Sequence, residues 1–374
     1  MANTSRTSSA TRSRGREVRS FDTVLVTGGA GFIGCNFIRY ALGRESFKGR
    51  VVNLDALSYA GNLESLQDVE AGFGGKRYFF ERADIRDLQA VCSVFDRYQP
   101  QAVVHFAAES HVDRSILGPR TFIETNIIGT FNLLEAARAA WKDQEGKLFH
   151  HVSTDEVYGS LGGHGRFTES SPYDPHSPYS ASKASSDHLV MACGNTYGLP
   201  VTLSNCSNNY GPYQFPEKLI PLMVLNMLEG KPLPVYGDGR NIRDWLYVQD
   251  HAAAIWSILE SGILLEKYNI GGENEWENIA LVRELCRKVA VRTGKPAQYY
   301  EKLITYVQDR PGHDRRYALD CSKIKRELGW TQAVKLPEGL DLTVDWYLRN
   351  PTWCNRVKSG DYREWMQANY GSRS

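Results

Sequence analysis

Short apolar runs alternate along the first half of the chain with stretches of helical periodicity. Runs rich in β-branched residues predict buried strands near residues 23–27, 50–55, 77–81, 102–106, 147–153 and 200–205. Apolar positions spaced by three and four residues predict helices between them, such as Gln89–Arg97 and Thr121–Ala140. This alternation is typical of an α/β fold with a doubly wound parallel sheet.

A glycine-rich turn follows the first predicted strand, and a helical pattern begins directly after it at Phe32 and Ile33. Gly28 permits the tight turn, Gly31 lets a pyrophosphate approach the backbone, and Gly34 lets helix and strand pack closely. The amino end of the helix would then face the phosphates. In this strand-turn-helix context the glycines predict a Rossmann-like dinucleotide site.

The second predicted strand ends on an acidic residue, Asp55. A carboxylate at this place accepts hydrogen bonds from an adenosine ribose, and it would repel a 2′-phosphate. The sequence therefore favours NAD over NADP, although an ordinary Asp at a strand end is the simpler interpretation. Asp84 and Ile85, after the third predicted strand, are candidates to flank the adenine.

The alternating pattern loosens after about residue 206, where Pro and Gly become frequent. Helices are still predicted near residues 216–229, 278–293 and 336–348, and segments 248–260 and 267–271 are predicted to return to the first half. The domain prediction is a nucleotide-binding domain over residues 21–206 with returning segments near 235–275, a smaller and mainly substrate-binding C-terminal domain over 207–350, and a C-terminal extension over 351–374.

Residues 1–20 differ from the rest of the chain, because they are rich in Ser, Thr and Arg and lack large apolar side chains. Such a composition predicts a disordered tail. Its acid-poor, Arg-rich character resembles an organelle transit peptide only weakly, and it lacks the apolar stretch of a secretory signal.

Two short motifs in the middle of the chain carry candidate chemistry. Tyr179 and Lys183 stand four residues apart, so on a helix they share one face. A lysine ammonium near a phenol lowers the phenol pKa, which makes Tyr179 a candidate base at neutral pH. Asp155 and Glu156, after the fifth predicted strand, add two carboxyl groups. The combination suits oxidation of an alcohol followed by elimination of water.

Each motif also has a simpler interpretation. A Tyr and a Lys at this spacing are often surface residues, and an Asp-Glu pair is often a solvated turn. The upstream glycine turn favours the functional interpretation, because ligands of such sheets bind beyond the carboxyl ends of the strands. Both Ala107–His111 and Ser153–Glu156 begin where apolar strands are predicted to end.

Composition agrees with a globular enzyme and excludes several other classes. The chain has 374 residues, 42% of them hydrophobic, and a net charge of +1, which gives no electrostatic signature for a nucleic-acid or membrane partner. The seven cysteines are scattered without metal-ligand spacing, so neither a disulfide framework nor a metal site is predicted. A reducing cytoplasm suits them. No apolar run approaches the ~20 residues of a membrane span.

Longer motifs extend these observations over most of the chain. They are TGGAGFIG (27–34), LDALSYAGN (54–62), HFAAESHVDRS (105–115), STDEVYG (153–159), SPYSASKASSDHL (177–189), NCSNNYGPYQFPEKLIPL (205–222), VYGDGRNIRDWLYVQDH (235–251), YNIGG (268–272) and RPGHDRRYALD (310–320). With these motifs the chain resembles the extended short-chain dehydrogenases/reductases and, among them, the dTDP-glucose 4,6-dehydratases. The resemblance implies a homodimer, tightly held NAD and a role in deoxysugar biosynthesis, with dTDP-glucose as substrate.

The resemblance also implies how the candidate side chains act on the sugar. Tyr179 would remove the proton of the glucose C4 hydroxyl while hydride passes from C4 to NAD, and Lys183 would bind the nicotinamide ribose and lower the Tyr179 pKa. Thr154 would hydrogen-bond the C4 oxygen. Glu156 would then take the C5 proton and Asp155 would protonate the departing C6 hydroxyl, after which hydride returns to C6.

Ligand contacts are carried over in the same way. Beside the residues already named, the implied cofactor contacts are Leu57, Ser58, Ala107, Ala108, Ser110, Thr125 and Asn205. The implied substrate contacts are Ser110, Thr154, Asn205, Lys218, Leu219, Pro234, Tyr236, Arg243, Asn278, Arg310, His313, Asp314 and Tyr317. Arg243 suits a diphosphate, because a guanidinium binds phosphate bidentately.

Three other functions compete with the dehydratase. A nucleotide-sugar 4-epimerase, or another nucleotide-sugar dehydratase, would share NAD, Tyr179 and Lys183, but an epimerase has no need for the acidic pair. A decarboxylase of a UDP-sugar acid would need a different group after Thr154. A catalytically silent NAD-binding regulator would need none of these side chains. The preference for thymine over uracil rests on the resemblance alone.

Overall fold

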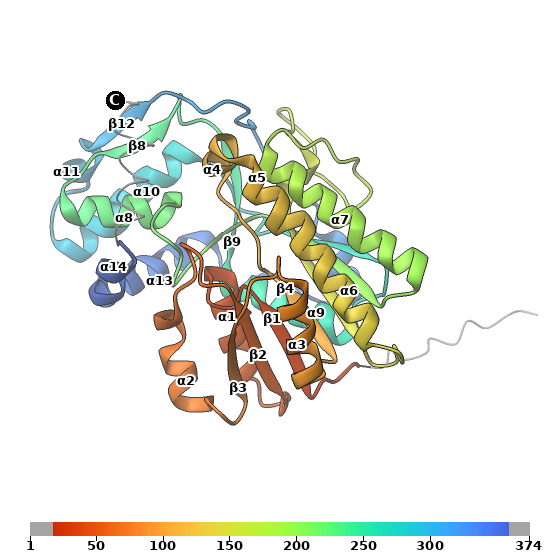
Figure 1. Cartoon of the computed structure of the whole chain (residues 1–374). Coiled ribbons are helices and arrows are strands. Elements are labelled where there is room, and N and C mark those ends of the chain that lie inside the picture. Colours follow the sequence, from red (N-terminus) through yellow and green to blue (C-terminus); the bar gives the residue numbers. More distant parts are fainter. Residues whose placement is uncertain (1–17, 359–374) are drawn as a thin grey trace, which may run out of the picture.

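The computed structural model describes residues 18–358 and is built around a seven-stranded parallel sheet (Figure 1). Its strands lie in the order β10-β6-β5-β4-β1-β2-β3, so chain order reverses between β1 and β4. A ligand of such a sheet binds at this reversal, beyond the carboxyl ends of the strands. The strands are β1 (Thr23–Thr27), β2 (Arg50–Asp55), β3 (Tyr78–Arg82), β4 (Ala102–His105), β5 (Leu148–Thr154), β6 (Val201–Cys206) and β10 (Lys267–Ile270).

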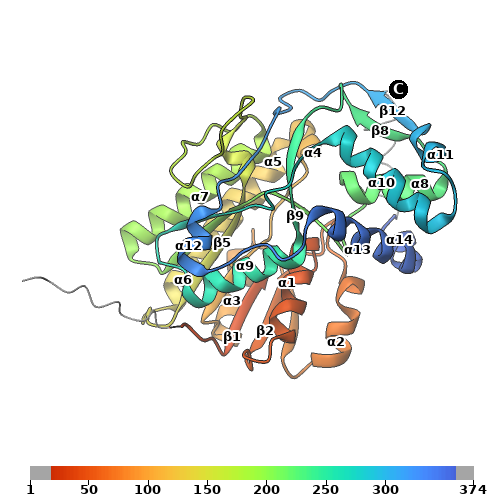
Figure 2. The ribbon, with the colours of Figure 1, turned by 180° about the vertical axis from the view of Figure 1, so that it is seen from behind.

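Helices cover both faces of the sheet, which explains why its central strands are buried throughout. In β1, Val24 and Val26 pack into one core cluster, while Leu25 packs into another on the opposite face. The first face is covered by α1 (Phe32–Gly43), α9 (Val248–Ser261) and α12 (Ser322–Leu328), as Figure 2 shows. The second face is covered by α3 (Leu88–Tyr98), α6 (Thr130–Ala140) and α7 (Pro178–Tyr197).

The helix predicted over residues 121–140 is not continuous. It consists of α5 (Pro119–Phe122), a π-helical stretch η2 (Ile123–Gly129) and α6, and α4 (Val112–Leu117) precedes it. The carbonyl oxygen of Asn126 accepts bonds from the hydroxyls of Thr130 and Ser186, at 2.5 and 2.6 Å. These bonds, and the Asn126 side-chain bonds to the Glu109 backbone, stabilise the wider turn.

The second half of the chain adds a separate core beside the carboxyl ends of the large sheet. It contains a three-stranded sheet, β11-β9-β7, and a two-stranded sheet, β12-β8. These strands are β7 (Asn208–Tyr210), β8 (Leu233–Tyr236), β9 (Ile242–Tyr247), β11 (Glu275–Glu277) and β12 (Ile304–Val307). The helices are α8 (Leu219–Glu229), α10 (Asn278–Thr293), α11 (Ala297–Glu301), α13 (Leu336–Arg349) and α14 (Pro351–Val357). The domain boundaries drawn from the sequence remain predictions.

Both predicted terminal segments fall largely outside the described residues. Of the tail predicted over residues 1–20, only 18–20 are described, and Arg19 there donates side-chain bonds to carbonyls at the end of α9, at 2.8 Å from Leu259 O. Of the extension predicted over 351–374, the described part is mainly α14, whose Trp353 indole donates to the Ser65 hydroxyl. No helix within residues 18–358 is long and apolar enough to cross a membrane.

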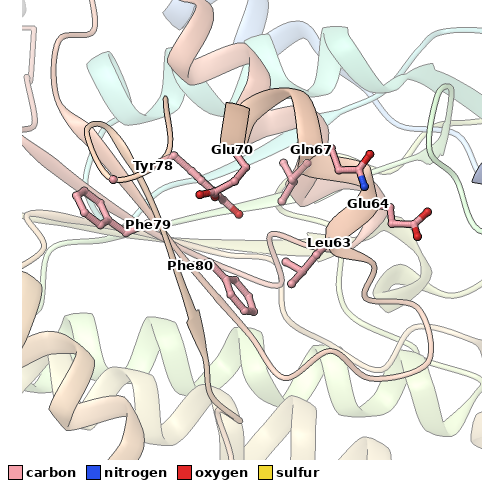
Figure 3. Close-up of a pocket in the computed structure, with 9 residues that line it drawn as sticks. Leu63, Glu64, Gln67, Glu70, Tyr78, Phe79 and Phe80 are labelled. Carbon is pink, nitrogen blue, oxygen red and sulfur yellow. The ribbon is translucent and has the colours of Figure 1, made fainter. Parts of the chain in front are cut away.

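A hollow of about 550 Å³ lies at the outer edge of the sheet, between β3 and the segment η1 (Leu63–Leu66) with α2 (Gln67–Phe73) (Figure 3). Its lining includes Tyr78, Phe79 and Phe80 from the edge strand. It shares no lining residue with the cleft at the carboxyl ends of the strands. The hollow is therefore separate from the site that the sequence predicts.

Candidate active site

One cleft brings together most of the predicted cofactor and catalytic residues. It runs along the carboxyl ends of the central strands, where the reversal of strand order predicts a ligand. Of the predicted residues, it is lined by Gly28, Gly31, Phe32, Ile33, Gly34, Asp55, Ser58, Asp84, Ile85, Ala107, Ala108, Ser110, Thr125, Thr154, Asp155, Glu156, Tyr179, Lys183 and Lys218. The sequence analysis missed other lining residues, among them Arg86, Thr121, Cys206, Ser207 and Glu217.

The glycine turn packs so closely against neighbouring backbone that two of its glycines leave no room for a side chain. Gly28 has a φ of +70°, and a Cβ added there would lie 2.7 Å from the Ala107 nitrogen. A Cβ on Gly34 would lie 2.3 Å from the Gly28 carbonyl oxygen. Gly31 caps α1 with no side-chain hydrogen bond, so the first N–H groups of the helix have no side-chain partner from the cap. These residues fit the pyrophosphate of a dinucleotide.

Asp55 is fixed at the end of β2 by two backbone donors. Its carboxylate accepts from the N–H of Ala30 at 2.9 Å and from the N–H of Leu57 at 2.8 Å. Burial raises the pKa of Asp55, and the two backbone bonds oppose that rise. Leu57 contributes its N–H to this arrangement but does not line the cleft. Asp84 does line it, paired with Arg86 at 2.6 Å.

Tyr179 and Lys183 lie on one face of α7, as their spacing predicts. The helix begins with a capping box between Ser177 and Ser180, with Pro178 in its first turn. Lys183 is buried, and its ammonium donates to the carbonyl oxygen of Val152 at 2.9 Å. Burial lowers the pKa of Lys183 to about 8.

The largest influences on the Tyr179 pKa in this structure are burial and a nearby carboxylate, and a lowering of that pKa by Lys183 stays a prediction. Burial raises the pKa of Tyr179 well above its usual value, the nearby Glu156 carboxylate raises it further, and a hydrogen bond with Thr154 acts against both. The physical reason is that Tyr179 is almost completely desolvated, which disfavours the phenolate.

Thr154, Asp155 and Glu156 sit where β5 ends and the short helix η3 (Asp155–Tyr158) begins. The Thr154 hydroxyl accepts from the Glu156 N–H at 3.3 Å and so caps η3. Asp155 is 2% exposed, and its Oδ2 atom has no hydrogen-bond partner among the described residues. Burial, Glu156 and Asp244 together raise the Asp155 pKa well above its usual value. Burial also raises the Glu156 pKa, but Arg310 and Arg243 oppose that rise.

The predicted substrate residues divide into two groups. Ser110 and Lys218 line the cleft, and the Lys218 ammonium donates to the Ser110 carbonyl at 3.1 Å. Asn205 does not line it, because its amide is used inside the protein, donating to the Thr154 carbonyl at 3.1 Å and accepting from the Tyr158 hydroxyl at 3.2 Å. The predicted substrate residues outside the lining are Asn205, Leu219, Pro234, Tyr236, Arg243, Asn278, Arg310, His313, Asp314 and Tyr317.

Part of this second group forms a cluster near Glu156. The Arg243 guanidinium lies 4.4 Å from the ring centre of Tyr317 and donates to the Asp314 carbonyl at 2.9 Å. Asp113 was missed from the sequence, although it lies inside the HVDRS motif. It accepts from the Tyr236 hydroxyl at 3.2 Å and pairs with Arg310 at 3.7 Å.

A contact joins the loop after β2 to the segment that precedes α8. Tyr59, in the loop after Asp55, donates to the Glu217 carboxylate at 3.0 Å and packs edge-on against Phe215. The Arg114 guanidinium lies 3.8 Å from the centre of the Tyr59 ring. The loop beside the predicted adenosine site is thus joined to the segment that carries Lys218. Among the described residues no group of three or more metal-ligating side chains is found.

Comparison with known proteins gives one consistent result. The family model described as GDP-mannose 4,6 dehydratase matches residues 25–343. A dTDP-glucose 4,6-dehydratase of Neisseria meningitidis is 57% identical, covering 91% of this chain and 97% of its own length, and that of Salmonella typhimurium is 54% identical, covering 94% and 99%. A solved dTDP-glucose 4,6-dehydratase of Streptomyces venezuelae, with NAD and dTDP bound, is 46% identical with a TM-score of 0.82, covering 90% and 100%. The chain therefore belongs to the GDP-mannose 4,6 dehydratase family and, within it, to the dTDP-glucose 4,6-dehydratases.

Proposed function

We infer that this protein is an NAD-dependent dTDP-glucose 4,6-dehydratase, a hydro-lyase that yields dTDP-4-keto-6-deoxy-glucose. One observation carries the inference: an acidic pair, the buried Asp155 and the half-buried Glu156, lines the same cleft as Tyr179 and Lys183. An enzyme that only oxidises and reduces C4 needs Tyr179 and Lys183, but it does not need Asp155 and Glu156. The high identity to dehydratases over nearly the whole chain supports the same conclusion.

The glycine turn, Asp55 and Lys183 would hold NAD, which when bound supplies a hydride acceptor that is regenerated within each turnover. Tyr179 would accept the proton of the sugar C4 hydroxyl as the phenolate, which the positive charges of Lys183 and of bound NAD would favour against the effect of burial on its pKa. Thr154, which already interacts with Tyr179, would donate to the C4 oxygen. Lys183 holds a positive charge on the same face of α7. The 4-keto group formed in this way makes the C5 hydrogen acidic.

Asp155 and Glu156 divide the elimination between them. The raised pKa of Asp155 keeps that carboxyl protonated, so it can donate to the departing C6 hydroxyl. Glu156 is the more readily ionised of the two, because Arg310 and Arg243 oppose the effect of burial on its pKa. It can therefore take the C5 proton. Arg243, Arg310 and Lys218 also supply the positive charge that a nucleoside diphosphate needs.

The active form is proposed to be a homodimer. Large apolar side chains are exposed along α4 to α6, including Leu117 at 76%, Ile123 at 49% and Phe131 at 41%. Exposed apolar side chains on successive helical segments are typical of a surface that a second subunit covers. Phe131→Glu should therefore give monomers in analytical ultracentrifugation, whereas Val291→Glu, at an exposed position on α10, should leave dimers.

The proposed location is the cytoplasm. All seven cysteines, Cys35 to Cys354, are free in the structure, and six of them are buried. Free thiols in this number suit a reducing compartment.

Incubation of the purified protein with dTDP-glucose and no added reductant tests the function directly. Mass spectrometry should show a product lighter than the substrate by one water. A product of unchanged mass would point to an epimerase, and no turnover would point to a binding protein. UDP-glucose in a parallel reaction measures the preference for the base.

A further inference from the structure

Three ionisable side chains form a buried group behind the cleft. The Lys183 ammonium lies 3.2 Å from the Nε2 atom of His151, and the same Nε2 atom lies 3.2 Å from the Oδ1 atom of Asp187. His151 is on β5, and Lys183 and Asp187 are one turn apart on α7. All three are buried, with His151 and Asp187 at 0% and 1% exposure. Burial of three such groups is costly unless they stabilise one another.

The Nε2 atom of His151 cannot form the same kind of hydrogen bond with both Lys183 and Asp187. A neutral imidazole nitrogen either donates one hydrogen or accepts one. If Nε2 accepts from Lys183, its lone pair faces Asp187 Oδ1, which is favourable only when that carboxyl carries a proton. If Nε2 donates to Asp187, Lys183 must direct its protons elsewhere. The charge on Lys183 is thus tied to where the protons lie on His151 and Asp187.

The neighbouring residue on β5 provides a contrast. His150 is equally buried but points to the other face of the sheet, where its ring nitrogens bond the hydroxyls of Thr202 and Ser204 at 2.9 and 3.1 Å. Two hydroxyls satisfy a neutral histidine completely. His151 instead has an ammonium and a carboxylate as neighbours, and its Nδ1 atom has no hydrogen-bond partner among the described residues.

We propose that His151 and Asp187 are positioning residues, which hold the Lys183 side chain in place and keep it charged while Tyr179 exchanges a proton with the substrate. The inference rests on the proposed roles of Tyr179 and Lys183. Asp187 is suited to this task, because its carboxylate favours the ammonium form of Lys183. Its other oxygen is fixed by the hydroxyls of Ser153 and Tyr173, both at 2.9 Å.

The other ionisable groups around the cluster do not supply the negative charge that Asp187 places beside Lys183. From β4, His105 packs against His151 with ring centres 5.1 Å apart, and burial lowers its pKa well below the usual value, so it is neutral. From β6, Cys206 faces Lys183, and burial raises its pKa to about 12, so it is also neutral. Tyr158 and, from β10, Lys267 also interact electrostatically with Asp187. The nearest charged partner of Lys183 is therefore Asp187.

The test is the pH dependence of kcat/KM for the NAD-loaded enzyme with dTDP-glucose. Loss of the His151 or Asp187 contact makes Lys183 easier to deprotonate, and a neutral Lys183 no longer favours the Tyr179 phenolate. His151→Leu and Asp187→Asn should each shift the alkaline limb, on which Lys183 loses its charge, downward by about one pH unit, which lowers kcat/KM about tenfold on that limb. His151→Gln, which restores a polar atom, should recover part of the shift.

Two further variants separate this role from a structural one. His150→Leu removes a histidine of equal burial from the same strand, so it should lower the Tm without moving the alkaline limb. Lys183→Gln carries no ammonium, so it should abolish that limb and lower kcat/KM at every pH. If Lys183→Gln abolishes it while His151→Leu and Asp187→Asn leave it in place, the inference is overturned and the proposed role of Lys183 stands. If Lys183→Gln leaves it in place, both are overturned.

Discussion

The Oδ2 atom of Asp55 accepts a hydrogen bond from the backbone N–H of Ala30 at 2.9 Å. This bond joins the acidic end of β2 to the glycine turn after β1, so two parts of the cofactor site hold each other in place. A second bond, from Leu57 N–H, fixes the other carboxylate oxygen. The carboxylate is thereby set in one orientation before any ribose binds.

This geometry predicts that the purified protein releases NAD and not NADP when it is denatured. Asp55→Asn should weaken NAD binding by about 1.5–3 kcal/mol, the range for a hydrogen bond to a charged group, and should reduce the discrimination against NADP. Reconstitution of the apoenzyme, followed by calorimetry with each cofactor, measures both effects. Asp143→Asn, an exposed loop carboxylate outside the cleft, is the matched control. A wild-type protein that retains mainly NADP would contradict the role of Asp55.

Tyr179→Phe should lower the rate by about 10²–10⁴-fold, the usual cost of losing a general base. The ring packs against Phe122, with ring centres 6.4 Å apart, and Phe preserves that contact, so Tm and NAD content should stay close to wild type. Tyr300→Phe removes a comparable hydroxyl, bonded to Thr293 outside the cleft, and should not slow turnover. Wild-type activity in the Tyr179 variant would exclude it as the base.

Asp155→Asn and Glu156→Gln should separate oxidation from elimination. Both variants keep Tyr179 and Lys183, so NADH should form on the enzyme when dTDP-glucose is added, while product appears about 10²–10⁴-fold more slowly. Absorbance of bound NADH follows the first step, and mass spectrometry follows the second. In Glu156→Gln, exchange of the C5 hydrogen with solvent deuterium should also fall. Product formation at the wild-type rate in both variants would favour an epimerase-like oxidoreductase.

Because His251 is buried, we predict that the folded protein loses stability as the pH falls. Burial lowers its pKa to about 3, whereas an unfolded histidine titrates near 6.5, so between these values the unfolded chain binds a proton that the folded chain does not. The free energy of unfolding therefore falls as the pH falls through this window, by about 1.4 kcal/mol per pH unit from this residue. His251→Gln should flatten the dependence by that amount in urea unfolding between pH 6 and 4. Parallel curves for the two proteins would contradict the assignment.

The six strands predicted in the first half agree with the structure to within one residue at nearly every end. They could be predicted because a parallel strand buried on both faces is a continuous β-branched run, as in Val51-Val52. Short strands such as β7 and β11 could not be predicted from the sequence, because each forms only by pairing with β9, which is distant along the chain. The π-helical turn depends on Asn126 contacts that no periodicity shows.

Which residues line the cleft could be predicted for the same reason, except where side chains turn away from it. Strand ends and the glycine turn place Asp55, Asp155 and Tyr179 at one rim, whatever their exact rotamers. Asn205 also stands near a strand end, but its amide is bonded to the Thr154 carbonyl behind the cleft wall. Arg86 lines the cleft, although nothing in its local sequence distinguishes it from a surface arginine.

The contact between Tyr59 and Glu217 has a consequence for how two segments of the chain move. The loop after β2 can separate from the segment that carries Lys218 only if this hydrogen bond breaks and the Tyr59 ring leaves Phe215 and Arg114. The cleft-lining residues on the two segments, such as Ser58 and Lys218, are therefore held at a fixed separation before any ligand arrives.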